Sequence, residues 1–554
     1  MACYREQIRG TAGVGPEMPR PSESVQCLQE EPHVSAGCEP VVDSDVSQVL
    51  CRLTSRGVQL WCEQGRLHYR APKGILSSEE LASLKEYRTQ ITALLEQRER
   101  GGEPTRPSCS AATAPLSYSQ LLHWRSSQLA VRPAIRHIAS ATRLSGSLNV
   151  QLLRESLRKV IDRQEALRTR IVMEQGDPTQ QIDNSIEVAL EVEDLSGMPQ
   201  GAREEEARHR VEDLIIQPID LARGPLAGFR LMKVGDEEHV LGIALEHIIS
   251  DAYSMGLLLR ELFTLYADLQ DGDISRLPPV GMSFADYARW QRGPQSDWIE
   301  THGPYWRERL GGCRRLRFPD DPAVLANPQE GWGKVGVHID RELKFALRQW
   351  ARAHRTTIVL GVLSAYVAVV LRWCECPDAV FQYQTDGRSL PGTESTIGFL
   401  AAELFLRVGI APHQRFSDLL ASLTQEYCKA TEHADYSYIA AQVPEPAFAR
   451  NPRFNWVPQA GPMSIPNSSG SQLLRCASVP IDPPLRHVAQ WDAEPSLLLY
   501  DQAETVSGAI FFPLERLTMG TMQLFQRNLM TFIRELARDP NQRIADIPMQ
   551  RVMH

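Results

Sequence analysis

The stretch that decides the fold is Val240-Leu-Gly-Ile-Ala-Leu-Glu-His-Ile-Ile-Ser-Asp-Ala-Tyr-Ser-Met-Gly256. Its first six residues are apolar or glycine, as in a strand buried on both faces, and an apolar helical pattern follows from Met255 to Leu269. Glu246, His247 and Asp251 stand between these two elements, and α/β folds place chemistry where a buried strand ends. The stretch is therefore a candidate active site in an α/β protein, with His247 able to titrate near neutral pH. A structural histidine with satisfied hydrogen bonds is the alternative explanation of the same pattern.

The same alternation of strands and helices extends from Pro115 to Ile544 and predicts an α/β fold. A second buried strand is expected at Val380–Tyr383. The apolar run Ile358–Trp373 is shorter than the ~20 residues that span a bilayer, so it predicts a core helix. Further helices are expected at Val150–Arg163, Glu342–His354 and Leu517–Leu536.

Composition excludes several classes of protein. The chain has 554 residues, 43% hydrophobic and 23% charged, which is typical of a globular protein with several domains. A formal net charge of -9 gives no excess of positive charge to bind nucleic acid. The 11 cysteines are scattered and odd in number, which favours reduced thiols, and none has zinc-ligand spacing. The N-terminus lacks the apolar run of a secretory signal, so we expect a cytoplasmic protein. The spacing of the cysteines gives no reason to expect a metal site.

The front of the chain divides into three segments. Residues 1–42 are rich in proline without periodicity and are expected to be a disordered leader. Residues 44–98 predict a helix, a β-hairpin and one or two further helices, with strands at 58–62 and 67–71. Such a unit is too small for an active-site cavity, but the edge of its hairpin can accept a strand from a partner. Residues 99–114 are expected to form a linker.

This small unit resembles the N-terminal β-hairpin docking domain, of the tubulysin type, of nonribosomal peptide synthetases. The resemblance lies in Arg56-Gly57-Val58, Leu60-Trp61, Leu67 and Pro72-Lys73-Gly74. It implies that the hairpin binds a short linear motif at the C-terminus of an upstream carrier-protein or synthase subunit. The partner motif would contact Leu60, Trp61, Arg66, Leu67, Tyr69, Arg70 and Lys73. Ordinary solvated charges are the alternative explanation of its basic residues.

The opening stretch resembles the core motif of condensation domains and of chloramphenicol acetyltransferase, His-His-x-x-x-Asp-Gly. In this chain Glu246 replaces the first His and Ala252 replaces the Gly, while His247 and Asp251 are retained. The resemblance implies that His247 does the chemistry, that Asp251 is mainly structural through an arginine partner, and that position 246 supports the site.

Further condensation motifs follow in order along about 430 residues. Arg388 is the expected partner of Asp251; Arg168, Trp290 and Gly256 are expected to support the architecture; and His123 and His433 are expected to be structural. Departures occur at Leu122, Gln164 and Ala402, where Arg, His and Asn are usual. The motifs lie at Ser117–Trp124, Arg163–Thr169, Pro218–Leu226, Phe284–Trp290, Gly387–Arg388, Ile397–Arg407, His433–Tyr436 and Arg450–Phe454.

The family implies a V-shaped pair of acetyltransferase-like lobes, here 115–285 and 286–545, with His247 in a tunnel between them. An acyl chain on a carrier protein's phosphopantetheine arm would meet a small amine or hydroxyl acceptor, giving an amide or an ester. The enzyme would need no cofactor of its own. No adenylation, carrier or thioesterase motif accompanies the domain, so the sequence predicts a free-standing, chain-releasing monomer.

Other interpretations stay open. Pairing of Glu246 with His247 would favour imidazolium, and Ala252 would resist a positive φ if the turn needs one. Either departure would leave a catalytically impaired scaffold that bridges assembly-line subunits. An acetyltransferase that uses acyl-coenzyme A is a third possibility, which the docking hairpin disfavours.

Overall fold

The computed structural model describes residues in two compact units, Met1–Glu103 and Pro104–His554. The division falls inside the predicted linker. The predicted helix near residues 46–53, Lys73 and most of the leader lie outside the described residues. These are 24–27, 59–63, 66–71, 84–85, 87–89, 91–92, 113–129, 137–184, 188–272, 275–293, 296–313, 315–322, 324, 329, 331–434, 451–459, 463–466, 473–479 and 494–550.

The first unit contains the predicted hairpin, β2 (Gln59–Glu63) and β3 (Arg66–Ala71), paired antiparallel. A third strand, β1 (Ser24–Cys27), pairs antiparallel with the other edge of β3. Since β1 falls within residues 1–42, the expectation of a leader without structure is incorrect at these four positions. Unpaired backbone groups on an edge strand readily accept another strand, which is what β1 supplies.

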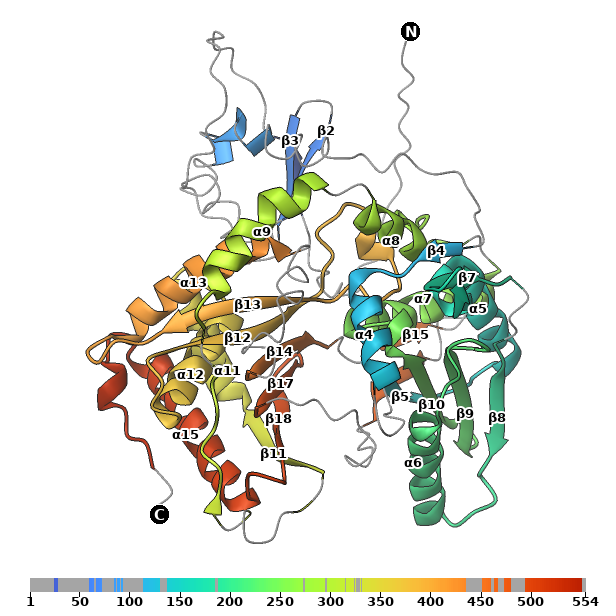
Figure 1. The fold of residues 1–554 in the computed structure, drawn as a ribbon. Coiled ribbons are helices and arrows are strands. Elements are labelled where there is room, and N and C mark those ends of the chain that lie inside the picture. Colours follow the sequence, from blue (N-terminus) through green and yellow to red (C-terminus); the bar gives the residue numbers. More distant parts are fainter. Residues whose placement is uncertain are drawn as a thin grey trace, which may run out of the picture. The chain divides into compact units, whose positions relative to one another are not determined.

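The first lobe of the larger unit is built on a six-stranded sheet in the order β15-β16-β5-β10-β9-β8 and a small sheet in the order β4-β7-β6 (Figure 1). The large sheet comprises β5 (His137–Ser145), β8 (Leu190–Asp194), β9 (Ala227–Gly235), β10 (Glu238–Glu246), β15 (Met463–Pro466) and β16 (Leu473–Ser478), and the small one β4 (Thr113–Pro115), β6 (Thr169–Glu174) and β7 (Asp177–Ile182). Helices are α4 (Tyr118–Leu129), α5 (Val150–Arg163), α6 (Gln200–Ile216), α7 (Ala252–Asp271) and α8 (Phe284–Arg292).

Strand β10 is central because both of its faces are covered. Leu241, Ile243 and Leu245 pack into the core that α5 and α7 share. On the opposite face α6 lies so close that a side chain at Gly242 would come within 2.9 Å of Val211. The apolar run in the sequence is therefore explained by burial on both faces, and its C-terminal end delivers Glu246 and His247 to the site.

The second lobe has a six-stranded sheet in the order β11-β18-β17-β14-β12-β13, in which β14 is parallel to both neighbours. Its core helix is α12 (Ile358–Trp373), buried over nearly its whole length, as predicted. The strands are β11 (Trp332–Ile339), β12 (Asp378–Thr385), β13 (Ala402–Gly409), β14 (Arg453–Pro458), β17 (Ser496–Asp501) and β18 (Val506–Pro513), and the other helices α9 (Ser296–Leu310), α11 (Arg341–Ala353), α13 (Phe416–Glu432) and α15 (Met519–Arg538).

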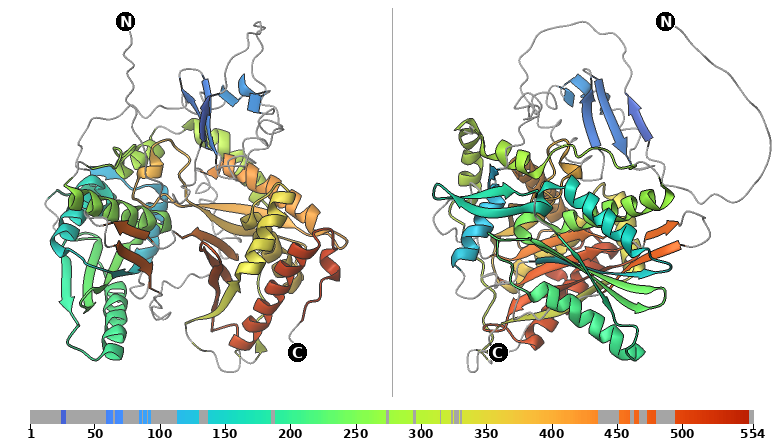
Figure 2. Two further views of the ribbon diagram at one scale, coloured as in Figure 1. Left: turned by 180° about the vertical axis from the view of Figure 1, so that it is seen from behind. Right: turned by 90° about the vertical axis from the view of Figure 1, so that its right-hand side faces the viewer.

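The two lobes lie side by side, and the chain returns once from the second lobe to the first. Strands β15 and β16 follow β14 in sequence, yet β16 pairs with β5 in the first lobe. Seen from behind, these orange strands lie among the green and cyan elements of that lobe (Figure 2). The predicted range 286–545 for the second lobe thus needs correction at residues 463–466 and 473–478.

No single helix in the part of the chain that the structure describes is long and apolar enough to cross a membrane. Helices α11 and α12 reach that length only together, and they meet at a bend of 102°. Cys313, Cys374, Cys376 and Cys476 are not disulfide-bonded. Cys428 is disulfide-bonded, so the prediction of reduced thiols is wrong at this position.

A close approach of strands β17 and β18 predicts a strong effect on stability. A Cβ atom at Gly508 would lie 2.0 Å from the carbonyl oxygen of Leu498, which belongs to the backbone and cannot turn aside. We expect Gly508→Ala to lower the free energy of unfolding by about 1–3 kcal/mol, measured by denaturant titration. Gly336→Ala is the matched control, because Gly336 lies on the neighbouring strand β11 with open space around it. Equal stability of the two variants would contradict this explanation.

Candidate active site

His247 begins a short 3-10 turn, His247–Ile249, directly after β10. Its Nδ1 lies 2.8 Å from the carbonyl oxygen of Ser250. A carbonyl only accepts hydrogen bonds, so Nδ1 carries the proton and Nε2 keeps its lone pair. Within the described residues Nε2 makes no hydrogen bond, which leaves it able to accept a proton from a reactant.

Two rings from distant elements face His247. The His123 ring, from α4, is centred 5.6 Å from it, and the Phe399 ring, from the segment between β12 and β13, is centred 4.4 Å from it. Burial lowers the pKa of His247 below its usual 6.5, and the positive charge of a protonated His123 lowers it further. The site thus favours neutral imidazole, although Glu246 and the Ser250 carbonyl oppose this effect.

Glu246 turns toward His123. One carboxylate oxygen lies 3.2 Å from Nε2 of His123, and the other accepts a hydrogen bond from the backbone N–H of Ile248. The side chains of His123 and Glu246 are only 9% and 8% exposed. The expected conflict between Glu246 and His247 is therefore eased, and His123, which the sequence assigned a structural role, is part of this cluster.

Asp251 and Arg388 form the predicted ion pair, and both side chains are 2% exposed. The Arg388 guanidinium donates to both carboxylate oxygens, at 3.0 and 3.2 Å. The same carboxylate accepts the backbone N–H groups of Ser254, Leu400 and Ala401. Asp251 is thus the N-cap of α7 and also an anchor for the segment 386–401 of the second lobe.

The turn that carries Arg388 depends on a glycine. Gly387 has a φ of +63°, and a side chain there would collide with the carbonyl oxygen of Leu400 at 1.8 Å. Arg388 also lies over the ring of Tyr253, 4.1 Å from its centre, and the Tyr253 hydroxyl donates to the carbonyl of Glu394. The cation–π contact adds a second link between α7 and this segment.

Two further residues hold the same segment, and the sequence analysis did not assign them a role. Gln164, noted only as a replacement of His, donates to Glu261 and to the carbonyl of Ser395 and accepts from the N–H of Ile397. Ser254 accepts the N–H of Gly398 and donates to its carbonyl. Of these two residues, only Gln164 could have been noticed in the sequence, because its amide side chain stands where the family motif usually has a histidine.

The residues that the sequence analysis expected to support the site have different environments in the structure. Ala252 is not among the residues with positive φ, and a side chain at Gly256 would meet open space, so the turn needs neither position to be glycine. Trp290 packs against the first lobe's core, as expected. Arg168 donates to the amide oxygen of Asn184.

His433 lies outside this cluster, at the end of α13. Its Nδ1 is 2.7 Å from Nδ1 of His302, and its ring stacks on Tyr305. Burial lowers the pKa of His433 to about 4, so it is neutral near pH 7. These contacts agree with the structural role that the sequence predicted.

The predicted docking residues lie on or beside the hairpin. Leu67 and Tyr69, on β3, are buried, with 0% and 4% of their surface exposed. Leu60, Trp61, Arg66 and Arg70 occupy β2 and β3, but their side chains, like Lys73, lie outside the described part. Burial gives Leu67 and Tyr69 a packing role, and their contact with a partner stays a prediction.

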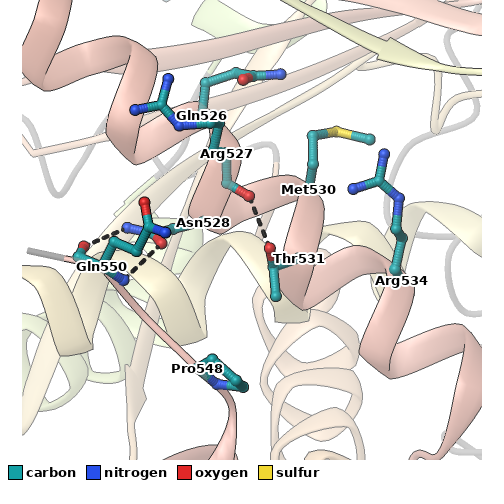
Figure 3. Close-up of a pocket in the computed structure, with 8 residues that line it drawn as sticks. All are labelled: Gln526, Arg527, Asn528, Met530, Thr531, Arg534, Pro548 and Gln550. Carbon is teal, nitrogen blue, oxygen red and sulfur yellow. Dashed lines mark hydrogen bonds between the residues drawn. The ribbon is translucent and has the colours of Figure 1, made fainter.

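A surface pocket of about 370 Å³ lies on α15 of the second lobe, and none of its lining residues belongs to the cluster around His247 (Figure 3). Its lining includes Arg527, Arg534 and the mutual hydrogen bonds of Asn528 and Gln550. Among the described residues, no group of three or more His, Cys, Asp or Glu side chains is arranged to hold a metal ion.

Two family models match the chain. The model described as "Condensation domain" matches residues 110–458, and the model described as "TubC N-terminal docking domain" matches residues 46–97. Malpinin synthetase of Mortierella alpina is 30% identical over 358 residues, which cover 64% of this chain and 5% of that protein. Chondramide synthase cmdD of Chondromyces crocatus is 28% identical over 355 residues, which cover 63% of this chain and 9% of that protein. The chain therefore spans a small part of each relative.

Solved structures share the fold. SgcC5 of Streptomyces globisporus, crystallised with a naphthyl ethanediol, aligns with a TM-score of 0.65 and 22% identity over 77% of this chain and 100% of that one. The starter condensation domain of rhizomide synthetase RzmA, crystallised with C8-CoA and Leu-SNAC, aligns with a TM-score of 0.66 and 19% identity, covering 81% of this chain and 100% of that one. At these identities the likeness concerns the fold.

The buried pair at the centre of the site predicts a large loss of stability when it is broken. Asp251→Ala leaves the Arg388 guanidinium buried without its counter-ion and removes the acceptor of three backbone N–H groups. We expect the free energy of unfolding to fall by about 3–5 kcal/mol in denaturant titration. Arg158→Ala, which breaks an exposed pair with Glu155, should change it very little. A small effect of Asp251→Ala would show that the anchor is dispensable.

Proposed function

Because the chain belongs to the condensation-domain family of acyl-transferring enzymes and carries a TubC-type docking domain before it, we propose that it transfers a carrier-bound acyl chain to a small acceptor. The donor would be a polyketide or peptidyl thioester on a phosphopantetheine arm, and the acceptor an amine or an alcohol. The observation that carries this proposal is the free lone pair on Nε2 of His247. The hydrogen bond from Nδ1 to the carbonyl oxygen of Ser250 fixes the tautomer that leaves this lone pair available.

The reaction follows from the position of that lone pair. The acceptor's nitrogen or oxygen attacks the thioester carbonyl while Nε2 of His247 takes its proton. The carbon–sulfur bond then breaks, and the proton passes to the departing thiolate. The first N–H groups of α7, at Ala252 and Tyr253, have no acceptor within the helix, so they are suited to stabilise the negative oxygen that forms. No covalent enzyme intermediate is required.

Delivery of the donor is assigned to the first unit. A docking domain ahead of a condensation domain suits a free-standing enzyme that receives its carrier in trans from an upstream subunit. The order of the two domains resembles the chain-releasing condensation enzyme of enacyloxin biosynthesis, and on this resemblance we infer that the finished chain is released as an amide or ester. The phosphopantetheine arm is a substrate held by the partner, so the enzyme needs no cofactor for this reaction.

Both acceptor classes deserve a test. SgcC5 was crystallised with a diol, and the RzmA starter domain with an aminoacyl thioester, so this fold accommodates an alcohol in one protein and an amine in the other. For this chain the likeness in fold supports a search among small alcohols and amines alike.

The base assignment predicts that His247→Ala abolishes transfer. We expect the acyl group to leave the carrier in the presence of the wild-type chain, with a matching amide or ester, and to stay on it with the variant. Intact-protein mass spectrometry of the acylated carrier measures both. His209→Ala, on the exposed face of α6, is the matched control and should retain the activity. Full turnover by His247→Ala would refute the proposal, and tight carrier binding without transfer to any acceptor would favour the scaffold alternative.

The docking assignment predicts a separate defect. Deleting residues 1–98 should raise the KM for the carrier-bound donor while leaving transfer from a free pantetheine thioester unchanged, because residues 104–554 form a compact unit of their own. Steady-state kinetics with the two donors measure this difference. An equal loss with both donors would mean that the first unit supports the second unit's chemistry and does not act in docking.

A further inference from the structure

The pair formed by His123 and Glu246 has no part in the reaction described above. It joins α4 to the end of β10, across 123 positions of sequence, beside the ring of His247. Glu246 stands where the family motif has a histidine, so this chain has placed a carboxylate next to its catalytic base. A neighbouring carboxylate favours the protonated imidazole, which cannot accept a proton from the acceptor.

The structure satisfies both oxygens of Glu246 without His247. A carboxylate accepts hydrogen bonds only, so Nε2 of His123 must carry the hydrogen in the 3.2 Å contact, whether His123 is neutral or charged. The other oxygen accepts the N–H of Ile248. Both side chains are almost fully buried, where such contacts are strong and unpaired charges are costly.

The remaining charged groups around the site are also engaged. Asp251, which follows His247 by four residues, is saturated by Arg388 and three backbone N–H groups. His137, opposite Glu246 in the register of β5 and β10, has its Nδ1 2.6 Å from the carbonyl of Ile215. Of the carboxylates named in the described part of the site, Glu246 is therefore the one whose pairing bears on the charge of His247.

We propose that His123 is a positioning residue that binds Glu246 and thereby keeps His247 in the neutral form that acyl transfer requires. The proposal deepens the proposed function and rests on it for the meaning of that neutral form. His123 itself need not touch either substrate. Its role is to hold a carboxylate that would otherwise hold the proton of His247.

The direction of the effect follows from the charges. The pKa of His247 lies below its usual 6.5, so the wild-type enzyme loses activity only as the pH falls through that lower value. Without His123, Glu246 is free to attract the imidazolium, and the electrostatic effect by which His123 lowers the pKa of His247 is lost. Both changes raise the pKa of His247, so the acid limb of the rate profile moves to higher pH.

The test uses the full chain with His123→Leu, Glu246→Gln and the double variant. We expect His123→Leu to move the acid limb of kcat/KM up by about one pH unit, a loss of roughly tenfold well below the limb and none well above it. Adding Glu246→Gln should restore the wild-type limb. A loss that is equal at all pH values, or that Glu246→Gln does not reverse, would overturn the proposal.

A second measurement separates this proposal from the proposed function. The titration of His247 is followed by NMR of isotope-labelled histidine in the substrate-free chain, with its signal identified by His247→Ala. His123→Leu should raise the observed pKa and the double variant should restore it, even if no acceptor is ever turned over. An unchanged pKa in His123→Leu would refute the role of His123. If that variant does not fold, His123→Gln is compared with His123→Ala: Gln keeps a donor toward Glu246, so the pKa of His247 should rise less in His123→Gln than in His123→Ala, and equal values in the two variants would refute the role of His123.

Discussion

The buried carboxylate of Asp251 is the interaction on which the rest of the site depends. Removing a charge from water costs several kcal/mol, and that cost is offset only when strong donors replace the water. Here five donors do so: two from Arg388 and three backbone N–H groups. Because they come from α7 and from the segment between β12 and β13, the charge can be satisfied only when the two lobes are correctly joined.

This anchoring explains why His247, the proposed general base, needs so few partners of its own. Strand β10, covered on both faces, fixes where His247 leaves the sheet, and the bond to Ser250 fixes its tautomer. The anchored segment brings Phe399 against the ring and helps to exclude water. Low hydration and the neighbouring His123 then favour neutral imidazole, the form that a general base requires.

The sequence predicted what depends on local pattern. Helices α5 and α12 begin and end where periodicity placed them, and the ion pair of Asp251 with Arg388 followed from family motifs. The sequence could not predict the pairing of His123 with Glu246, because the residues around each of them give no information about a partner 123 positions away. The return of β16 to the first lobe was missed for the same reason, since an alternating strand does not specify the sheet that it joins.

That returning strand has a consequence for synthesis on the ribosome. The outer edge of β5 (His137–Ser145) is paired only by Leu473–Ser478, which emerge roughly 300 residues later. At a translation rate of about 5–20 residues per second, this edge stays unpaired for tens of seconds. Unpaired strand edges can form hydrogen bonds with other chains. The first lobe is therefore expected to depend on chaperones, or on temporary cover of this edge, until residues 473–478 have been made.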